Sequence, residues 1–156
     1  MQLYLLRHAD AEPHAISDAA RELTSKGIEQ AKRVGKFCRS NNLVPSIIVT
    51  SPLVRAEQTA RIVAKELEMQ EVVVAPFLKC GMHPDAALEE LKSHLRFESV
   101  MLVGHEPDFS CLAAKLLGSS SGEKINLRKA SLTLFDITDA KASSAVLQFS
   151  IPAKLL

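Results

Sequence analysis

Residues 46–67 read SIIVTSPLVRAEQTARIVAKEL, and this stretch decides the fold. Its first part, residues 46–50, is apolar and rich in β-branched side chains, which is typical of a buried strand. Its second part carries apolar side chains at the spacing of one helix face, at Leu53, Ala56, Ala60, Val63 and Leu67. That spacing is typical of an amphipathic helix that packs on a core. A strand followed directly by a helix is the unit from which α/β folds are built.

The same alternation runs through most of the chain. Similar short runs predict further strands at residues 2–6, 71–74, 99–103, 131–137 and 145–151. Helical spacing recurs at Ile28, Ala31, Val34 and Cys38, at Leu88, Leu91 and Leu95, and at Leu112, Ala113, Leu116 and Leu117. Pro84 and Pro107 are typical of helix starts, and Gly118 is typical of a helix end.

The order of these elements predicts the architecture. Strands and helices alternate through the first two thirds, and the last two strands follow each other after the polar stretch 118–124. We therefore expect an α/β fold with three layers, in which helices flank a mostly parallel central sheet of about six strands. With 156 residues and 47% hydrophobic content, the chain is expected to form a single domain over residues 1–156.

Composition narrows the range of partners. Lys and Arg number 19 against 18 Asp and Glu, so no net field draws the protein onto nucleic acid or an anionic membrane. Arg7 and His8 interrupt the first apolar run, so neither a signal peptide nor a membrane span is expected, and we predict a cytoplasmic protein. Cys38, Cys80 and Cys111 are widely spaced, so we expect reduced, partly buried thiols and neither a disulfide framework nor a zinc site.

Polar side chains follow four of the predicted strands. They are Arg7-His8 after the first strand, residues 51–55 after the second, 76–84 after the third and 104–107 after the fourth. Ligands of parallel sheets bind beyond the carboxyl ends of the strands, where these segments would meet. Each segment alone would be read as an ordinary surface loop, but their convergence on one edge predicts a site.

These residue types suit phosphoryl transfer, which needs an in-line nucleophile and fixed positive charge on the phosphoryl oxygens. Arg7 and Arg55 can each bind phosphate through two N–H groups, while His8 and His105 can be neutral nucleophiles or charged donors near pH 7. Two arginines beside His8 would also disfavour its charged form and leave a lone pair free. The catalytic and phosphate-binding residues we predict are thus Arg7, His8, Arg55 and His105, and we assign no role to His14 or His94.

Four motifs in order resemble a known family. Leu6-Arg7-His8-Ala9 resembles the opening signature of the histidine phosphatase superfamily, also called the phosphoglycerate mutase-like fold. Residues 18–31, 51–60 and 103–107 are similar to its later motifs, so the resemblance extends from Leu3 to about Pro107. The chain resembles the SixA-type phosphohistidine phosphatases in its short length, in Ala9, in the spacing of Asp18 and Arg21 and in the Gly-His-x-Pro segment.

The resemblance implies a function and a set of roles. His8 would be the residue that becomes phosphorylated, and Arg7, Arg55 and His105 would complete the phosphate pocket. The implied substrate is phosphohistidine on the phosphotransfer domain of a signalling relay, with no metal and no organic cofactor.

One position departs from the family pattern. Many superfamily members that hydrolyse phosphoesters have a Glu general acid after the third strand, and Cys80 stands about there in this chain. A thiol with a pKa of about 8.5 is a poor proton donor to an alkoxide. His83 and Asp85 are alternative donors, although Asp85 after Pro84 is more simply a first-turn charge that favours the helix dipole.

Two alternative functions stay open at this point. The same site could hydrolyse small phosphate esters, which would require a pocket that encloses them. A non-catalytic module could instead bind phosphorylated proteins through its two arginines, but then neither His8 nor His105 would be needed.

Overall fold

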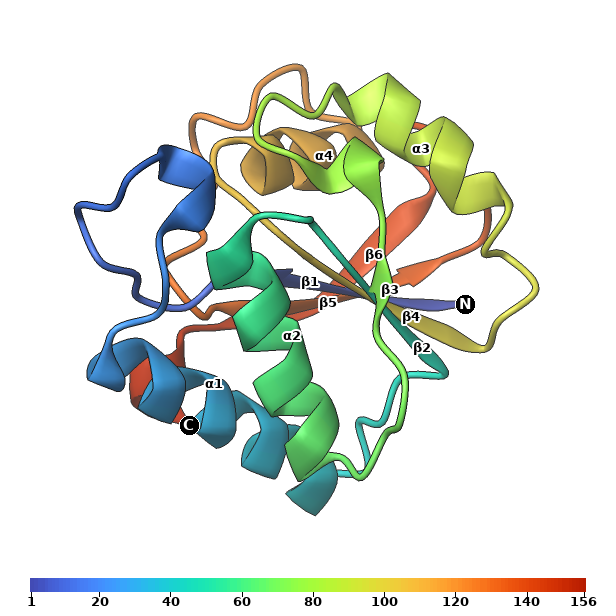
Figure 1. The fold of residues 1–156 in the computed structure, drawn as a ribbon. Coiled ribbons are helices and arrows are strands. Elements are labelled where there is room, and N and C mark those ends of the chain that lie inside the picture. The colour runs from blue at the N-terminus through green and yellow to red at the C-terminus, as the bar shows by residue number, and fades with distance from the viewer.

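The computed structural model describes all residues from 1 to 156. It contains six strands and four α-helices, which alternate until the last two strands follow each other (Figure 1). The strands are β1 (Gln2–Arg7), β2 (Ile47–Thr50), β3 (Val73–Val74), β4 (Ser99–Gly104), β5 (Leu132–Ile137) and β6 (Ala145–Ile151). The helices are α1 (Ser25–Ser40), α2 (Val54–Glu66), α3 (Pro84–Lys92) and α4 (Asp108–Leu116), with short 3-10 turns η1 (Asp18–Ala20), η2 (Pro76–Leu78) and η3 (Ala153–Leu155).

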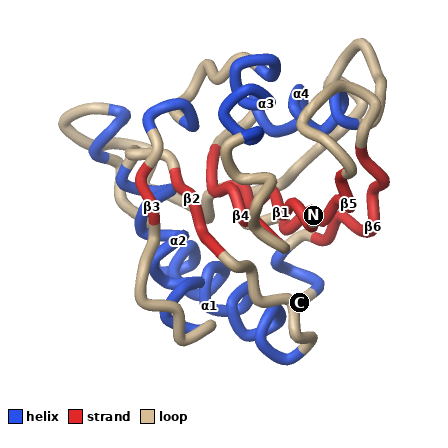
Figure 2. Tube along the Cα trace, turned by 90° about the vertical axis from the view of Figure 1, so that its right-hand side faces the viewer, coloured by secondary structure: helices blue, strands red, loops and turns tan.

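The strands form one sheet in the order β3-β2-β4-β1-β5-β6. Strands β1 to β4 are mutually parallel, and β5 pairs antiparallel with both β1 and β6. Helices α1 and α2 cover one face of the sheet, and α3 and α4 cover the other (Figure 2). The three-layer fold with a mainly parallel sheet is therefore confirmed.

Both faces of the sheet are buried, which explains why its strands are nearly continuous apolar runs. In β1, Tyr4 and Leu6 join the core under α1 and α2, while Leu3 and Leu5 join the core under α3 and α4. Because alternate residues of a strand point to opposite faces, a single strand serves both cores.

Several boundaries differ from the prediction. The third strand was expected over residues 71–74, but β3 keeps only Val73 and Val74, each 41% exposed at the edge of the sheet. Leu95 lies beyond the end of α3, so it is not part of that helix face. Prolines and glycine behave as predicted, because Pro84 opens α3, Pro107 precedes α4 and Gly118 follows α4 with a φ of 78°.

The buried face of α1 is rotated from the predicted one. Ile28 is 37% exposed, whereas Gly27 and Gly35 are buried together with Ala31, Val34 and Cys38. A Cβ atom on Gly35 would lie 2.5 Å from the Cβ of Glu66, so α1 and α2 approach each other through small residues. Hydrophobic spacing cannot show such a contact, since it depends on the partner helix.

No helix is long and apolar enough to cross a membrane.

Candidate active site

The candidate site lies beyond the carboxyl ends of the three central strands, β1, β2 and β4. Arg7 pairs with Gly104 in the parallel β1–β4 ladder, so the next residues, His8 and His105, leave the sheet at the same level. Their ring centroids are 5.2 Å apart, and both residues are buried, as is Arg55 in the first turn of α2. The structure thus brings together the histidines and the arginine that the sequence placed on separate loops.

The loop after His8 is held by two helices. Its Ala9 N–H donates to Thr59 Oγ1 of α2 at 3.1 Å, and its Asp10 N–H donates to Gln30 Oε1 of α1 at 2.9 Å. A Cβ atom on Gly27 would lie 1.9 Å from the Asp10 carbonyl oxygen, so only glycine fits there. These motif residues are therefore scaffolding that fixes the position of His8.

The hydrogen bonds of His8 assign its ring proton. Nδ1 lies 2.8 Å from the carbonyl oxygen of Ala9, which can only accept, so Nδ1 carries the proton of the neutral ring. Nε2 then keeps its lone pair, and Arg55 Nε donates to it at 3.3 Å. The nitrogen with the free lone pair is therefore Nε2, and it faces the guanidinium group of Arg55.

Both histidines are held in the neutral form. Burial lowers the pKa of His8 to about 3, opposed by the hydrogen bond to Ala9 and reinforced by the nearby His105, Arg55 and Arg7. Burial likewise lowers the pKa of His105 to about 4, with Arg55 as the next cause. The two arginines were expected to be the reason for a neutral His8, but removal of the ring from water is the larger effect.

Asp18 organises the arginines of the site. Arg55 donates through Nη1 to the carbonyl oxygen of Asp18 at 2.7 Å and through Nη2 to its carboxylate at 3.0 Å. The other carboxylate oxygen lies 3.5 Å from Arg21 Nε. Sequence reasoning gave neither Asp18 nor Arg21 a role, and an acidic and a basic residue in the loop that follows the nucleophile were the available signal.

Ser51, which directly follows β2, contacts the second histidine. Its Oγ lies 2.7 Å from His105 Nε2 and accepts from the Leu53 N–H at 3.2 Å. Donation from the hydroxyl to Nε2 would satisfy the serine and leave the ring proton of His105 on Nδ1. Sequence reasoning quoted Ser51 in a motif without assigning it this contact.

The unpaired polar atoms of the protein converge on this site. Four buried side-chain atoms have no hydrogen-bond partner, namely Arg7 Nε, Arg21 Nε, His105 Nδ1 and Glu106 Oε1. Buried polar groups are nearly always paired, and an unpaired one costs about 1–3 kcal/mol. Arg21 Nε faces the Asp18 carboxylate at 3.5 Å, whereas Arg7 Nε and His105 Nδ1 are free to donate. These two donors suit an anion with several oxygens, such as a phosphoryl group.

Cys80 also reaches the site. The Asp108 carboxylate accepts from the N–H groups of Gly81 at 2.9 Å and Met82 at 3.2 Å, which fixes the preceding Cys80 with its Sγ 3.4 Å from Arg55 Nη2. The residue is exposed, contrary to the expectation of a partly buried cysteine. Its sulfur is nevertheless shielded enough that burial raises the pKa of the thiol, so it is a weak acid.

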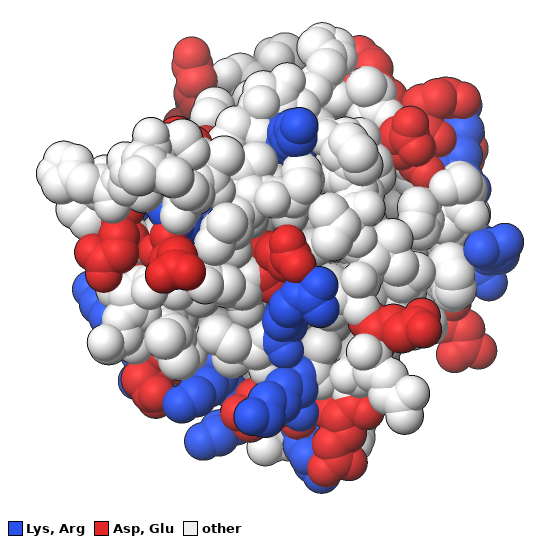
Figure 3. Space-filling view, viewed as in Figure 1, with Lys and Arg blue, Asp and Glu red and all other residues white.

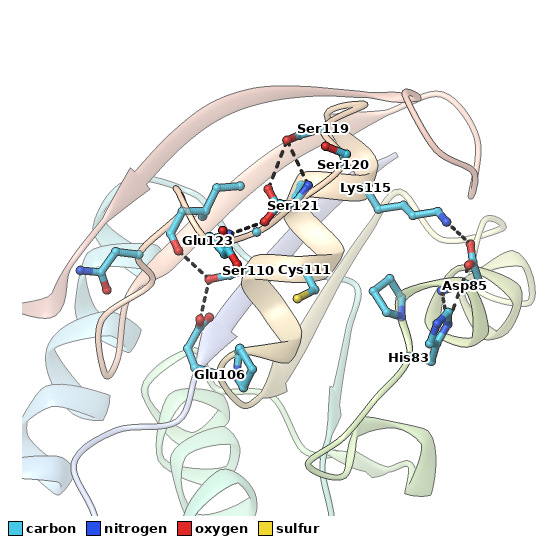
Figure 4. A pocket seen from close by; sticks show the side chains of 16 residues that line it. His83, Asp85, Glu106, Ser110, Cys111, Lys115, Ser119, Ser120, Ser121 and Glu123 are labelled. Carbon is cyan, nitrogen blue, oxygen red and sulfur yellow. Dashed lines mark hydrogen bonds and ion pairs between the residues drawn. The ribbon is translucent and has the colours of Figure 1, made fainter.

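The two alternative proton donors are ordinary surface residues. Asp85 forms a 2.6 Å ion pair with Lys115, which lowers the pKa of its carboxyl group. His83 caps α3 by accepting from the Asp85 N–H through Nδ1 at 3.4 Å (Figure 4). An ionised carboxylate cannot donate a proton, so the first-turn interpretation of Asp85 is supported.

A different carboxyl group belongs to Glu106, the residue that follows His105 in the chain. Ser110 Oγ donates to Oε2 of Glu106, whose Oε1 is buried without a partner. Burial raises the pKa of this carboxyl group despite the hydrogen bond from Ser110 and the charge of Arg7. The sequence analysis included Glu106 in a motif without giving it a role.

A hollow of the surface lies along α4. Its volume is about 810 Å³, and Glu106 lies at its edge, with α4 and the serines of residues 119–121 around it (Figure 4). His8 and His105 do not line it. The unpaired donors Arg7 Nε and His105 Nδ1 belong to residues that do not line this hollow. No group of three or more His, Cys, Asp or Glu residues is arranged to hold a metal ion.

Comparison with known proteins gives a consistent result. The profile of the histidine phosphatase superfamily (branch 1) matches residues 3–79. A phosphohistidine phosphatase SixA homolog of Haemophilus influenzae is 33% identical over 130 residues, covering 76% of this chain and 78% of the relative. Phosphohistidine phosphatase SixA of Escherichia coli is 28% identical over 119 residues, covering 74% of each chain.

Solved structures show the same fold. The protein histidine phosphatase SixA complexed with tungstate superposes with a TM-score of 0.89, covering 99% of each chain at 21% identity. The structure of the SixA protein from Nakamurella multipartitia superposes with a TM-score of 0.80 at 25% identity, covering 97% of this chain and 95% of that one.

Proposed function

Because the chain belongs to the histidine phosphatase superfamily and is a phosphatase, we propose that it removes phosphate from phosphohistidine on a signalling phosphotransfer protein. The reaction would pass through a covalent phosphohistidine on His8, with Arg7, Arg55 and His105 binding the phosphoryl group, all within a single domain of residues 1–156. The observation that carries this proposal is the buried, neutral ring of His8, whose Nε2 lone pair faces Arg55. The names of the E. coli and H. influenzae relatives support the substrate class.

The first step forms a bond and breaks one at phosphorus. Nε2 of His8 attacks the phosphorus atom and the P–N bond to the substrate breaks. The substrate ring, which carries a proton on its other nitrogen, takes the electron pair of that bond and leaves as neutral imidazole. Arg55 Nε, which now donates to Nε2, would turn to a phosphoryl oxygen once that lone pair is used. Arg7 Nε and His105 Nδ1 supply further donors, fixed before the reaction begins.

The second step restores the enzyme. Water attacks the phosphorus atom on His8, the P–N bond to Nε2 breaks and inorganic phosphate leaves. The electron pair of the broken bond returns to Nε2, and both protons of the water stay on the phosphate. Burial of the ring then disfavours its protonation, so His8 is again neutral.

The leaving group supports phosphohistidine as the substrate. Imidazole has a conjugate acid with a pKa of about 6.5, so it can leave with little assistance, whereas an alkoxide needs a proton donor. Cys80, in the place of the family's general acid, has a pKa raised by burial. A site with this thiol suits a P–N bond better than an alkyl ester.

Trapping the intermediate tests the proposal. Enzyme quenched during turnover of a phosphohistidine protein should carry phosphate on His8, as an acid-labile and alkali-stable phosphoramidate. His8→Ala should abolish both labelling and turnover while the circular dichroism spectrum stays unchanged. Label on a serine or cysteine would contradict the mechanism.

A second candidate function is hydrolysis of small phosphate esters, and Glu106 favours it. Glu106 directly follows His105 in the chain, burial raises the pKa of its carboxyl group, and a general acid contributes about 10²- to 10⁴-fold. Values of kcat/KM on phosphohistidine, an aryl phosphate and an alkyl phosphate decide between the two. Alkyl esters as fast as phosphohistidine, with selective loss in Glu106→Gln, would favour this candidate.

Membership in a phosphatase family does not support the non-catalytic phosphoprotein-binding module. Action in the cytoplasm, without nucleic acid or membrane as a partner, stays a prediction.

A further inference from the structure

An exposed loop stands beside the candidate site. Residues 12–19 are all exposed, in the segment between the nucleophile loop and α1. The segment projects from the body of the molecule at the left of Figure 1, and the same protrusion is mostly uncharged in Figure 3. It is therefore a surface that a large molecule would meet on its way to the site.

Both ends of this loop are fixed. At its start, the Glu12 N–H donates to the carbonyl oxygen of Glu22 at 2.8 Å, next to the bridge between Ala11 and Leu23. At its end, Asp18 accepts two hydrogen bonds from Arg55. The loop is thus attached to the same guanidinium group that faces His8.

The tip of the loop carries exposed apolar side chains, with the polar His14 and Ser17 among them. Ile16 is fully exposed, at 101%, and its neighbours Pro13 and Ala15 are exposed as well. Two other strongly exposed apolar side chains, Val146 at 63% and Leu155 at 67%, belong to β6 and η3 and not to this loop. A single exposed apolar side chain is ordinary, so the significance of Ile16 depends on its position relative to the candidate site.

The depth of the nucleophile limits what can approach it. His8 is 6% exposed and Arg55 is 3% exposed, so a phosphohistidine must reach inward while the protein that carries it rests on the rim. The projecting loop is part of that rim, because Asp18 at its end contacts Arg55. A small substrate with the same P–N bond would enter without touching the tip.

We propose that residues 12–17 form a docking surface for the protein that carries the phosphohistidine, with Ile16 as its apolar anchor. The partner would present an apolar side chain beside the modified histidine. The Glu12 carboxylate at the start of the loop would favour neutral or basic groups around that side chain, whereas the Asp18 carboxylate is already paired with Arg55 and Arg21. This inference rests on the proposed function, and it adds the means by which a protein substrate is selected.

Two substrates with the same leaving group test the docking surface. One is a phosphotransfer domain phosphorylated on histidine, and the other is the free amino acid phosphohistidine. Burying an isoleucine side chain corresponds to about tenfold or more in affinity, so Ile16→Ser should lower kcat/KM on the protein by about tenfold, mainly through KM. Turnover of free phosphohistidine should stay unchanged, and Val146→Ser is the matched control.

Each outcome has a definite meaning. An unchanged kcat/KM of Ile16→Ser on the phosphorylated domain would overturn the docking surface. Equal losses on both substrates would also overturn it, because the loop would then act on the catalytic groups, and an equal loss in Val146→Ser would show a general surface effect. If the wild type turned over neither substrate, the proposed function itself would fail, and the docking surface with it.

Discussion

The neutral state of His8 makes the most direct prediction, because it links the mechanism to the stability of the fold. Burial lowers the pKa of His8 to about 3, whereas a histidine in the unfolded chain titrates at about 6.5. Between these values the unfolded state binds a proton that the folded state does not. Stability from this group is therefore fully present above pH 6.5 and is lost as the pH falls toward 3.

The size of the effect follows from the shift. Each pH unit in this window lowers the free energy of unfolding by about 1.36 kcal/mol, so the 2.5 units between pH 6.5 and pH 4 lower it by roughly 3 kcal/mol. His105, whose pKa is lowered to about 4, adds a loss of similar order over the same window. Since domains are typically stable by about 5–15 kcal/mol, the protein should be markedly less stable at pH 4 than at pH 7.

Urea denaturation at pH 7 and pH 4 measures this loss. In His8→Gln the titrating group is gone, so the fall in the free energy of unfolding should be smaller than in the wild type by roughly 3 kcal/mol. Val146→Gln, which places the same side chain at an exposed position of β6, should fall as much as the wild type. Equal losses in the wild type and His8→Gln would refute the reasoning.

Nuclear magnetic resonance of the ring nitrogens tests the same shift without denaturation. At pH 5 a histidine with a pKa of about 6.5 would be roughly 3% neutral, whereas His8 with a pKa of about 3 should be about 99% neutral. Its signals, assigned by their loss in His8→Gln, should be those of the Nδ1–H tautomer. A change of charge between pH 6 and pH 7 would contradict both the depth of burial and the proposed nucleophile.

Four further predictions concern the surrounding side chains. Arg55→Lys keeps the charge but loses the planar guanidinium group that contacts His8 and Asp18, so kcat/KM should fall about 10²- to 10³-fold. Full activity of this variant would show that Arg55 contributes only a charge. Cys80→Ala should change turnover of any substrate by no more than a few fold, and a larger loss would give the thiol a catalytic role. The backbone carbonyl of residue 18 remains in both Asp18→Asn and Asp18→Ala, but Asn keeps a side-chain oxygen that can accept from Arg55 and Ala does not. Activity should therefore fall in Asp18→Asn and fall further in Asp18→Ala, as kcat and KM measured for each variant would show. Glu106→Gln should leave phosphohistidine turnover within a few fold, and a loss of about 10²-fold confined to alkyl phosphates would identify the missing acid.

Features that depend on neighbours along the chain could be predicted from the sequence. The apolar runs and helical spacings predicted the order of strands and helices, because burial on both faces of a parallel sheet leaves a periodic trace in the chain. The edge at which Arg7, His8, Arg55 and His105 meet followed from the same reasoning, since polar segments after parallel strands lie together. Their catalytic roles stay predictions.

Contacts between distant segments were decided only by the tertiary structure. The Arg55 side chain reaches His8 across 47 positions and Asp18 across 37, and no pattern along the chain encodes those distances. Burial of the His8 ring outweighed the arginines in lowering its pKa, which could not be known before the surrounding layers were in place. The sequence thus determined which groups gather at this edge, and the packed fold decided which of them are neutral, which are paired and which are left free to bind an anion, because those properties depend on neighbours in space.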